Sequence, residues 1–373
     1  MTTCFVRNSI GRVFFGALFA ASLAPAARAQ WIATSLHPRE ARWSQARGGS
    51  GLQQAGIASV GPLDRAALWT GTPGSFIDLH PEGSIRSAAW GVGDGQQVGT
   101  VRIGNADRAA LWTGSAASWV DLNPAGASSS IARAASAGRQ AGRVSLGSSL
   151  RAALWSGAPE SWVNLHPPGT VASEVFGMDR DHQVGYVFGG GVRASLWTGT
   201  AASWIDLQPA GISESFALGV ADGQQVGYTS VLGVSRAALW SGSAASYVDL
   251  HPGWAAQSQA RSVTAGTQVG WIDVGEGPLA ALWAGSAQSA LFLHEFLPAH
   301  FLTSTAESIW AEGDRTFVAG YGRNGLTARE EALLWVIPAP ASALPLALLA
   351  AIPRRRHAPS PSGAFLNTPC CTG

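Results

Sequence analysis

Residues 108–112 read Arg-Ala-Ala-Leu-Trp, and the recurrence of this pentapeptide along the 373-residue chain decides the fold. It recurs at six further places, in identical or degenerate form: residues 65–69, 151–155, 193–197, 236–240, 279–283 and 331–335. The tryptophan that ends each copy marks seven positions: Trp69, Trp112, Trp155, Trp197, Trp240, Trp283 and Trp335. Successive copies are about 43 residues apart except the last, which is a longer interval, and a fixed period of this size indicates a repeat architecture.

A second element repeats with the same rhythm. Residues 96–99 read Gln-Gln-Val-Gly, and relatives of this element place a glycine at Gly56, Gly99, Gly142, Gly185, Gly227, Gly270 and Gly320. Two independent markers therefore agree on seven units.

Four short strands fit into each unit. In the second copy they are predicted at 85–92, 97–103, 108–113 and 118–122, separated by turns rich in glycine and asparagine. Four strands in about 43 residues are typical of one blade of a β-propeller. The sequence therefore predicts an all-β propeller of seven four-stranded blades, and the irregular last interval leaves six or eight blades as alternatives.

The ends of the repeat region predict how the ring closes. The last unit has three strands and lacks the fourth, which elsewhere reads Trp-Val-Asp-Leu-His-Pro or similar. Residues 31–38 (Trp-Ile-Ala-Thr-Ser-Leu-His-Pro) supply a matching element at the start of the repeat region. A first strand that completes the last blade removes the exposed sheet edges of an open array.

The repeat resembles the HAF family of extracellular repeats over residues 31–337. The matching elements are Gln-Val-Gly-Tyr at 183–186 and 225–228, Leu-Trp at the end of the pentapeptides that follow, and Val-Asp-Leu at 248–250. Arg-Ala-Ala stands where that family has His-Ala-Phe. The resemblance implies a cell-surface location and no particular activity.

Residues 1–29 are predicted to be a secretory signal peptide. Arg7 and Arg12 precede a short apolar run at 13–23, and Ala-Arg-Ala at 27–29 forms a small-residue cleavage site. The apolar run is too short for a transmembrane anchor. We expect an exported protein whose mature chain begins at Gln30 with the propeller domain, 30–337.

Residues 338–356 resemble a PEP-CTERM sorting signal. A Pro-Ala-Pro element at 338–340 is followed by an apolar stretch at 343–352 and three arginines at 354–356. This resemblance implies anchoring at the cell surface after processing by an exosortase-type enzyme. The alternative is a low-complexity Ala/Pro tail, and residues 357–373 are predicted to be a disordered tail.

Composition excludes several classes of function. The formal net charge is +1, which gives no electrostatic basis for binding nucleic acid. Cys4, Cys370 and Cys371 all lie outside the repeats, so no disulfide framework or thiolate metal site is expected there. No cofactor and no catalytic residue is predicted, and a monomer is expected.

Polar residues that repeat with the blades are predicted to be structural. One position is a histidine in five copies, His37, His80, His166, His251 and His294, and is Asn123 or Gln208 in others. Such a series fits a hydrogen-bonding residue at a strand end better than a metal site. A series of arginines, with Arg65 as the first, is expected to pair with a series of aspartates, with Asp78 as the first; the alternative is an anion-binding face.

Two irregular clusters are the metal-site candidates. The first comprises Asp179, Asp181 and His182, in a turn that departs from the Gly-Asp-Gly-Gln of other copies. The second comprises His294, Glu295 and His300, in the long last interval. Neither spacing matches an established calcium or zinc motif, so an elaborated turn is the alternative for the first cluster.

From these features we expect a non-enzymatic surface propeller that binds a polysaccharide or a surface protein. The alternatives are a carbohydrate-active enzyme with its acid pair in the channel and a purely structural surface protein.

Overall fold

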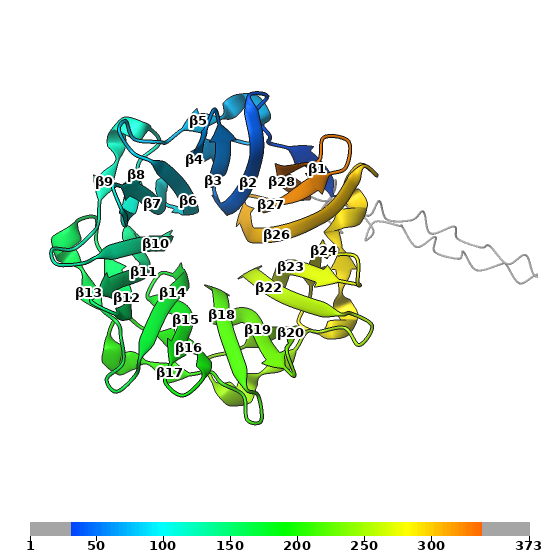
Figure 1. Cartoon of the computed structure of the whole chain (residues 1–373). Helices are drawn as coiled ribbons and strands as arrows, with labels where there is room; N and C mark the ends of the chain where they lie inside the picture. The colour runs from blue at the N-terminus through cyan, green and yellow to red at the C-terminus, as the bar shows by residue number, and fades with distance from the viewer. Residues whose placement is uncertain (1–30, 338–373) are drawn as a thin grey trace, which may run out of the picture. The chain divides into compact units, whose positions relative to one another are not determined.

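The strands of a computed structural model, which describes residues 31–337, form a closed ring of seven sheets with four antiparallel strands each (Figure 1). The predicted seven-bladed propeller is therefore confirmed. The predicted signal peptide (1–29), sorting segment (338–356) and tail (357–373) lie outside the described residues.

Each blade has its first strand at the channel and its last strand at the rim (Figure 1). The innermost strands are β2 (Ala41–Ser50), β6 (Arg86–Gly93), β10 (Ser129–Ser136), β14 (Ala172–Asp179), β18 (Glu214–Ala221), β22 (Gln257–Thr264) and β26 (Phe301–Glu312). The second strands are β3 (Gln53–Val60), β7 (Gln96–Ile103), β11 (Arg139–Leu146), β15 (His182–Phe188), β19 (Gln224–Val231), β23 (Thr267–Asp273) and β27 (Arg315–Asn324). We number the blades from β2, so blade 7 contains β26.

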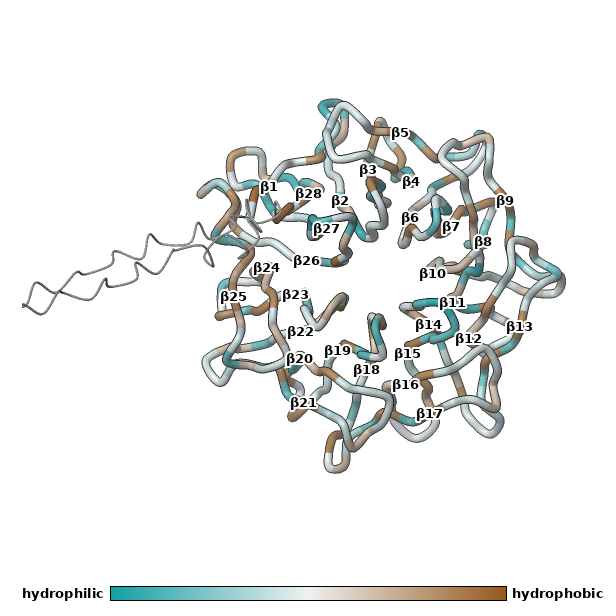
Figure 2. Tube along the Cα trace, turned by 180° about the vertical axis from the view of Figure 1, so that it is seen from behind, coloured by the Kyte–Doolittle hydropathy of each residue, from teal (hydrophilic) through white to brown (hydrophobic). Residues whose placement is uncertain are grey.

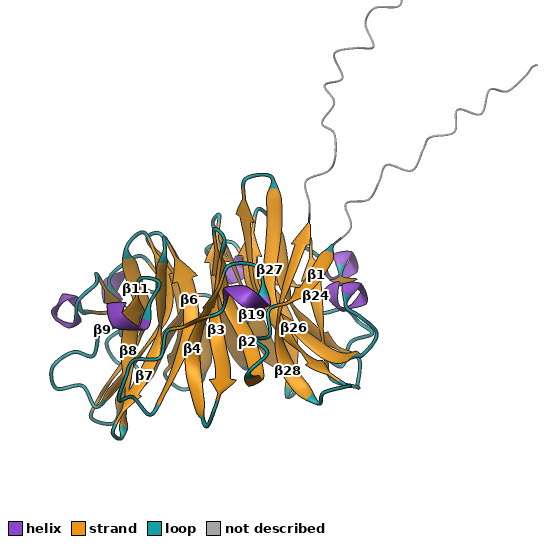
Figure 3. Ribbon diagram, turned by 90° about the horizontal axis from the view of Figure 1, so that it is seen from above, coloured by secondary structure: helices purple, strands orange, loops and turns teal. Residues whose placement is uncertain are grey.

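The third strands carry the repeated pentapeptide: β4 (Leu63–Trp69), β8 (Ala106–Trp112), β12 (Ser149–Trp155), β16 (Val192–Trp197), β20 (Val234–Trp240), β24 (Pro278–Trp283) and β28 (Arg329–Ile337). The rim strands are β5 (Ile77–Asp78), β9 (Val120–Asp121), β13 (Val163–Asn164), β17 (Ile205–Asp206), β21 (Val248–Asp249), β25 (Leu291–Phe292) and β1 (Ile32–Ser35). Seen edge-on, the strands of each blade cross the ring from one face to the other (Figure 3).

The rim strands are shorter than the sequence predicted. In blade 2 the predicted strand 118–122 is a two-residue strand, β9, preceded by a 3-10 turn at Ala116–Ser118. The Ser118 hydroxyl accepts a hydrogen bond from the Thr113 amide at 2.8 Å and donates one to the Ser115 carbonyl at 2.6 Å. These local bonds replace the ladder hydrogen bonds that a longer strand would make.

The repeated tryptophans form the core between blades, as the pentapeptide predicted. All seven have no exposed surface, and Trp112 packs in one cluster with Leu68 and Leu79 of the preceding blade. Polar and apolar positions are mixed along the chain in every blade (Figure 2), and the apolar core is divided among the junctions between neighbouring sheets.

The repeated glycine is required by close approach of the backbone. A Cβ atom at Gly99 would lie 1.9 Å from the Ala88 carbonyl oxygen, and the corresponding distance is 1.8–2.0 Å at the other six positions. No larger side chain fits there without moving the innermost strand.

The N-terminal strand closes the ring, as predicted. β1 pairs antiparallel with β28, with Ile32 opposite Val336, and the Leu36 amide donates to the Ala332 carbonyl at 2.7 Å. The long last interval arises from a 3-10 turn at Leu293–Phe296 and from β26 and β27, which are 12 and 10 residues long. Within residues 31–337 no helix is long and apolar enough to cross a membrane.

Candidate functional site: the central channel

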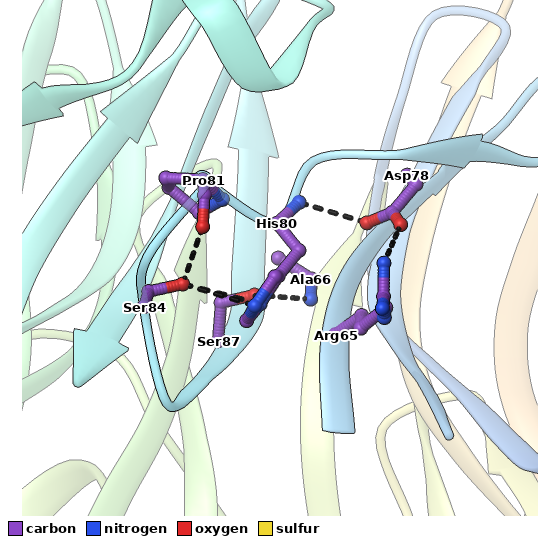
Figure 4. Close-up of polar contacts among 7 residues, drawn as sticks. All are labelled: Arg65, Ala66, Asp78, His80, Pro81, Ser84 and Ser87. Atoms are coloured by element: carbon purple, nitrogen blue, oxygen red, sulfur yellow. Dashed lines mark hydrogen bonds and ion pairs between the residues drawn. The ribbon is translucent and has the colours of Figure 1, made fainter. Parts of the chain in front are cut away.

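The repeated histidine position is a structural junction between blades. His80 Nδ1 lies 2.8 Å from the Ser87 hydroxyl, and that hydroxyl accepts a hydrogen bond at 2.8 Å from the Ala66 amide of the preceding blade (Figure 4). Since Ser87 and Ala66 are both buried, the serine satisfies a backbone donor that water does not reach.

All seven junctions have this arrangement. The serines that accept from a backbone amide are Ser44, Ser87, Ser130, Ser173, Ser215, Ser258 and Ser304. A histidine contacts the serine in five junctions, and Asn123 or Gln208 does so in the other two. The hydrogen-bonding role predicted for this position is confirmed.

The repeated arginines pair with the repeated aspartates, as predicted, in four blades. The ion pairs are 2.5–2.9 Å long: Arg65–Asp78, Arg108–Asp121, Arg193–Asp206 and Arg236–Asp249. The other carboxylate oxygen of Asp78 accepts from the His80 amide at 2.8 Å (Figure 4), so the aspartate also shapes the turn that leads to the next blade. Blade 3 has Asn164 in this place, and Arg151 makes no ion pair with any described residue.

The irregular clusters do not form metal centres within residues 31–337, where no three His, Cys, Asp or Glu side chains come together as potential ligands. Residues 179–182 make the turn between β14 and β15, with Arg180 at φ +50°. Asp181 instead pairs with Arg139 of the preceding blade at 3.2 Å. His294 Nδ1 contacts Ser304, whereas the His300 ring lies against Phe301.

The channel contains a ring of residues that the sequence analysis missed. Each innermost strand has a β-bulge where it pairs with the second strand, and the extra residues are Arg47, Trp90, Arg133, Phe176, Leu218, Arg261 and Glu307. We call these seven residues the bulge ring. All of them line one cavity of about 420 Å³, in agreement with the tendency of bulges to redirect side chains at functional sites.

The two halves of the channel differ in chemistry. The cavity of about 420 Å³ is also lined by Phe216, Tyr228 and Gln259. Phe216 and Gln259 lie near the starts of their innermost strands, and Tyr228 is opposite Phe216. This part of the cavity therefore faces the side of the ring where the innermost strands begin, each after a turn such as His80-Pro81. We call this the His-Pro face and the cavity the mouth cavity. The other half is a cavity of about 310 Å³, lined beyond the bulge ring mainly by small and aliphatic residues.

Close packing of the innermost strands explains the small residues beyond the ring. A Cβ atom at Gly48 would lie 2.9 Å from the Gly91 Cα atom of the next blade, and one at Gly91 would lie 2.6 Å from the Arg133 carbonyl oxygen. The backbones of neighbouring blades therefore leave no room for larger side chains there.

Two of the three arginines in the bulge ring are held by carboxylates and aromatic rings. Arg47 lies 3.4 Å from Glu307 and over the Trp90 and Tyr321 rings. Arg133 lies 2.9 Å from the buried Glu174. Cation–π contacts of Arg133 with Trp90 and Phe176 add to this network.

Aromatic rings form a continuous row beside these charges. The centroids of Phe176, Tyr186, Phe216 and Tyr228 are successively 5.7, 5.7 and 4.8 Å apart. A channel with fixed guanidinium groups and ring faces can bind a ligand that carries both an anionic group and an apolar or aromatic part.

The fold defines the class of protein, a seven-bladed β-propeller closed by its N-terminal strand. No family model and no curated protein matches the chain, so the resemblances to HAF repeats and to a PEP-CTERM signal stay predictions.

Solved structures of similar fold include two hydrolases and a peptide-bound propeller. They are puromycin hydrolase complexed with PGG (TM-score 0.52, 12% identity, 80% of this chain and 56% of that chain), acylaminoacyl peptidase from Pyrococcus horikoshii (0.50, 9%, 82% and 53%) and YCF48 bound to D1 peptide (0.51, 14%, 84% and 97%). The chain thus spans about half the length of the two hydrolases. At these identities the likeness concerns the fold.

These matches correct the function expected from the sequence. The expectation was a non-enzymatic surface propeller that binds polysaccharide or a surface protein, with a carbohydrate-active enzyme or a structural surface protein as alternatives. The similar propellers instead include parts of peptidases, so this expectation was wrong. The similarity covers only the propeller part of the peptidases, which leaves the enzymatic status of this chain open to proposal.

Proposed function

We propose that this chain is a peptide-binding propeller of the peptidase-associated kind, and that the mouth cavity of its channel holds the peptide. The observation that carries this proposal is the bulge ring. Three arginines and one glutamate face the same cavity as five aromatic or aliphatic side chains, a combination that suits the mixed chemistry of a peptide.

The mouth cavity is large enough to hold a peptide segment of a few residues. A volume of about 420 Å³ lies within the range of about 300–1,000 Å³ that small-ligand sites occupy. The structural match with YCF48 extends over 97% of that chain, and the YCF48 structure holds a bound peptide.

We also propose that the chain recognises peptides and does not cleave them. The polar groups that line the mouth cavity are guanidinium, carboxylate, phenol and amide groups, which bind and orient a ligand. Because residues 1–29 are predicted to direct export, we propose that binding takes place outside the cytoplasm.

Fluorescence anisotropy of labelled pentapeptides with the full chain tests the proposal. We expect saturable binding that Trp90→Ala weakens about 10- to 30-fold, the loss typical of a buried aromatic hot spot. Arg315→Gln is the matched control, since Arg315 is exposed at the hairpin turn between β26 and β27, and it should leave binding unchanged. Mass spectrometry of the incubated peptides should find them intact.

Two results would refute the proposal. One is that no peptide in the panel binds saturably. The other is that Trp90→Ala, folded as judged by its melting temperature, binds as tightly as the wild type.

A further inference from the structure

One arginine of the bulge ring differs from the other two. Arg47 and Arg133 each have a carboxylate within 3.4 Å, whereas Arg261 makes no ion pair with any described residue. Its Nε atom, like that of Arg47, is buried and has no hydrogen-bond acceptor within residues 31–337, so Arg261 lacks both an ion pair and an acceptor at Nε. A buried donor without an acceptor is costly, and a bound anion would satisfy it.

Arg261 shares the mouth cavity with a stacked aromatic pair. Phe216 and Tyr228 lie opposite each other on β18 and β19, with ring centroids 4.8 Å apart and planes 17° apart. Burial raises the pKa of the Tyr228 phenol, and the positive charge of Arg261 opposes this shift. The guanidinium group and the two rings line the same cavity.

The charges along the channel favour a carboxylate that stops at the bulge ring. The mouth cavity is lined by three arginines against Glu307. The other half of the channel adds Asp94 and Asp179 to the same charged side chains. The arginines outnumber the carboxylates in the mouth cavity and equal them in the other half, so an anionic group that enters from the His-Pro face is attracted as far as the ring and gains no further attraction beyond it.

The shape of the channel favours the end of a peptide over an internal acidic residue. A C-terminal carboxylate has chain on one side only, so it reaches the ring from the mouth cavity without threading the smaller half. With an internal Asp or Glu at the ring, the peptide would continue on both sides of that residue. One of its two arms would then have to enter the smaller half of the channel, where the strands pack closely at Gly48 and Gly91.

We propose that Arg261, Phe216 and Tyr228 form a subsite for the free C-terminal carboxylate of a peptide whose last residue is aromatic. The guanidinium group donates two parallel hydrogen bonds to the carboxylate, and the terminal side chain packs on the Phe216 and Tyr228 rings. This inference rests on the proposed peptide-binding function and specifies which peptides the channel takes.

Four fluorescein-labelled peptides test the subsite by anisotropy with the full chain. The first, Gly-Ala-Gly-Ala-Phe, has a free carboxyl end. The second is the same peptide with an amidated end, the third ends in Ala with a free carboxyl group, and the fourth is amidated and carries an internal Asp.

We expect the first peptide to bind about 10- to 100-fold more tightly than its amide, the range for a hydrogen bond to a charged group. Arg261→Gln should reduce this ratio to about threefold or less, and Arg315→Gln should leave it unchanged. The peptide that ends in Phe should bind about 3- to 10-fold more tightly than the one that ends in Ala. Phe216→Ala should remove this preference for Phe and keep the preference for a free carboxyl end.

The failures of the two proposals are distinguishable. Equal binding of acid and amide overturns the carboxylate subsite and leaves peptide binding standing. Binding of the internal-Asp amide as tightly as the first peptide overturns the assignment to the chain end. A preference for a free end that survives Arg261→Gln places the carboxylate elsewhere. Absence of binding by all four peptides overturns the subsite and, with the pentapeptide panel, the proposed function.

Discussion

Replacement of Ser87 by Ala tests the junction between blades 1 and 2. The Ser87 side chain is buried, accepts from the Ala66 amide at 2.8 Å and contacts His80 Nδ1 at 2.8 Å. Ser87→Ala leaves the Ala66 N–H, which has no exposed surface, without an acceptor, at a cost of about 1–3 kcal/mol. Loss of the second contact adds about 0.5–1.5 kcal/mol, so we expect a total destabilisation of about 1.5–4.5 kcal/mol.

Urea unfolding of the full chain measures the loss, and amide hydrogen exchange at Ala66 locates it. Ser84→Ala is the matched control because the Ser84 hydroxyl lies on the same turn, donates to the Pro81 carbonyl at 2.7 Å and also contacts His80, with Nε2 at 3.1 Å (Figure 4), but its removal leaves no buried amide unpaired. We expect the control to lose about 1 kcal/mol or less.

A double-mutant cycle with His80→Ala completes the test. Since His80 and Ser87 share one contact, the two losses should be less than additive. A loss of stability in Ser87→Ala no larger than that in Ser84→Ala, or exchange at Ala66 as slow as in the wild type, would show that Ser87 is not the acceptor that the Ala66 amide needs.

Three further predictions concern the repeat and its titration. Gly99→Ala should destabilise the protein by about 1–3 kcal/mol or more, because the new Cβ atom would lie 1.9 Å from the Ala88 carbonyl oxygen. Gly74→Ala is the control, since nothing lies within 4 Å of a Cβ atom there, and it should leave the melting temperature unchanged. Equal melting temperatures for the two variants would contradict the close approach at Gly99. Trp155→Ala should cost about 3–5 kcal/mol by calorimetry or urea unfolding, since Trp155 is fully buried; an unchanged midpoint would count against its place in the core. Burial lowers the pKa of five histidines below 6.5: His37, His80, His166, His251 and His294. As the pH falls, these histidines are therefore protonated in the unfolded chain before they are protonated in the folded one. Their contribution to stability is complete above pH 6.5 and should be lost as the pH falls below 6.5. The urea midpoint should therefore be lower at pH 5.5 than at pH 7.5, less so in His166→Asn, which copies the residue at Asn123; a midpoint that rose on acidification would contradict the sign.

The sequence predicted the fold because the repeat exposes its physical constraints at fixed positions. Trp112 has to fill the space between two sheets, and Gly99 has to admit the Ala88 carbonyl, so both residues recur in every copy. The closing strand was predictable because residues 31–38 match the element missing from the last unit. The length of the rim strands was not, because Ser118 uses its hydroxyl in a 3-10 turn where a ladder would have continued.

The bulge ring was missed because its residues do not repeat. A bulge adds one residue to the innermost strand, so the alternation of faces that predicts burial is interrupted at that point. A signal was nonetheless available. Arg47, Trp90 and Arg133 each stand between two small residues, as do the corresponding residues of every other blade except Phe176, which follows Val175. A position whose residue varies from copy to copy, while its neighbours stay small, marks the place in the repeat where the side chain is not fixed by packing.

The pairing of β1 with β28 also governs the order in which the molecule assembles. Ser35 and Glu331, which contact each other across this pair, are 296 positions apart. Contacts of such long sequence separation form slowly, because the entropy of closing the loop is lost before the contact forms. During synthesis from the N-terminus, β1 has no partner until the ribosome has made β28. Of the strands in residues 31–337, β1 is thus made first and is among the last to find its place, and until then β28 is an unpaired edge of the last sheet.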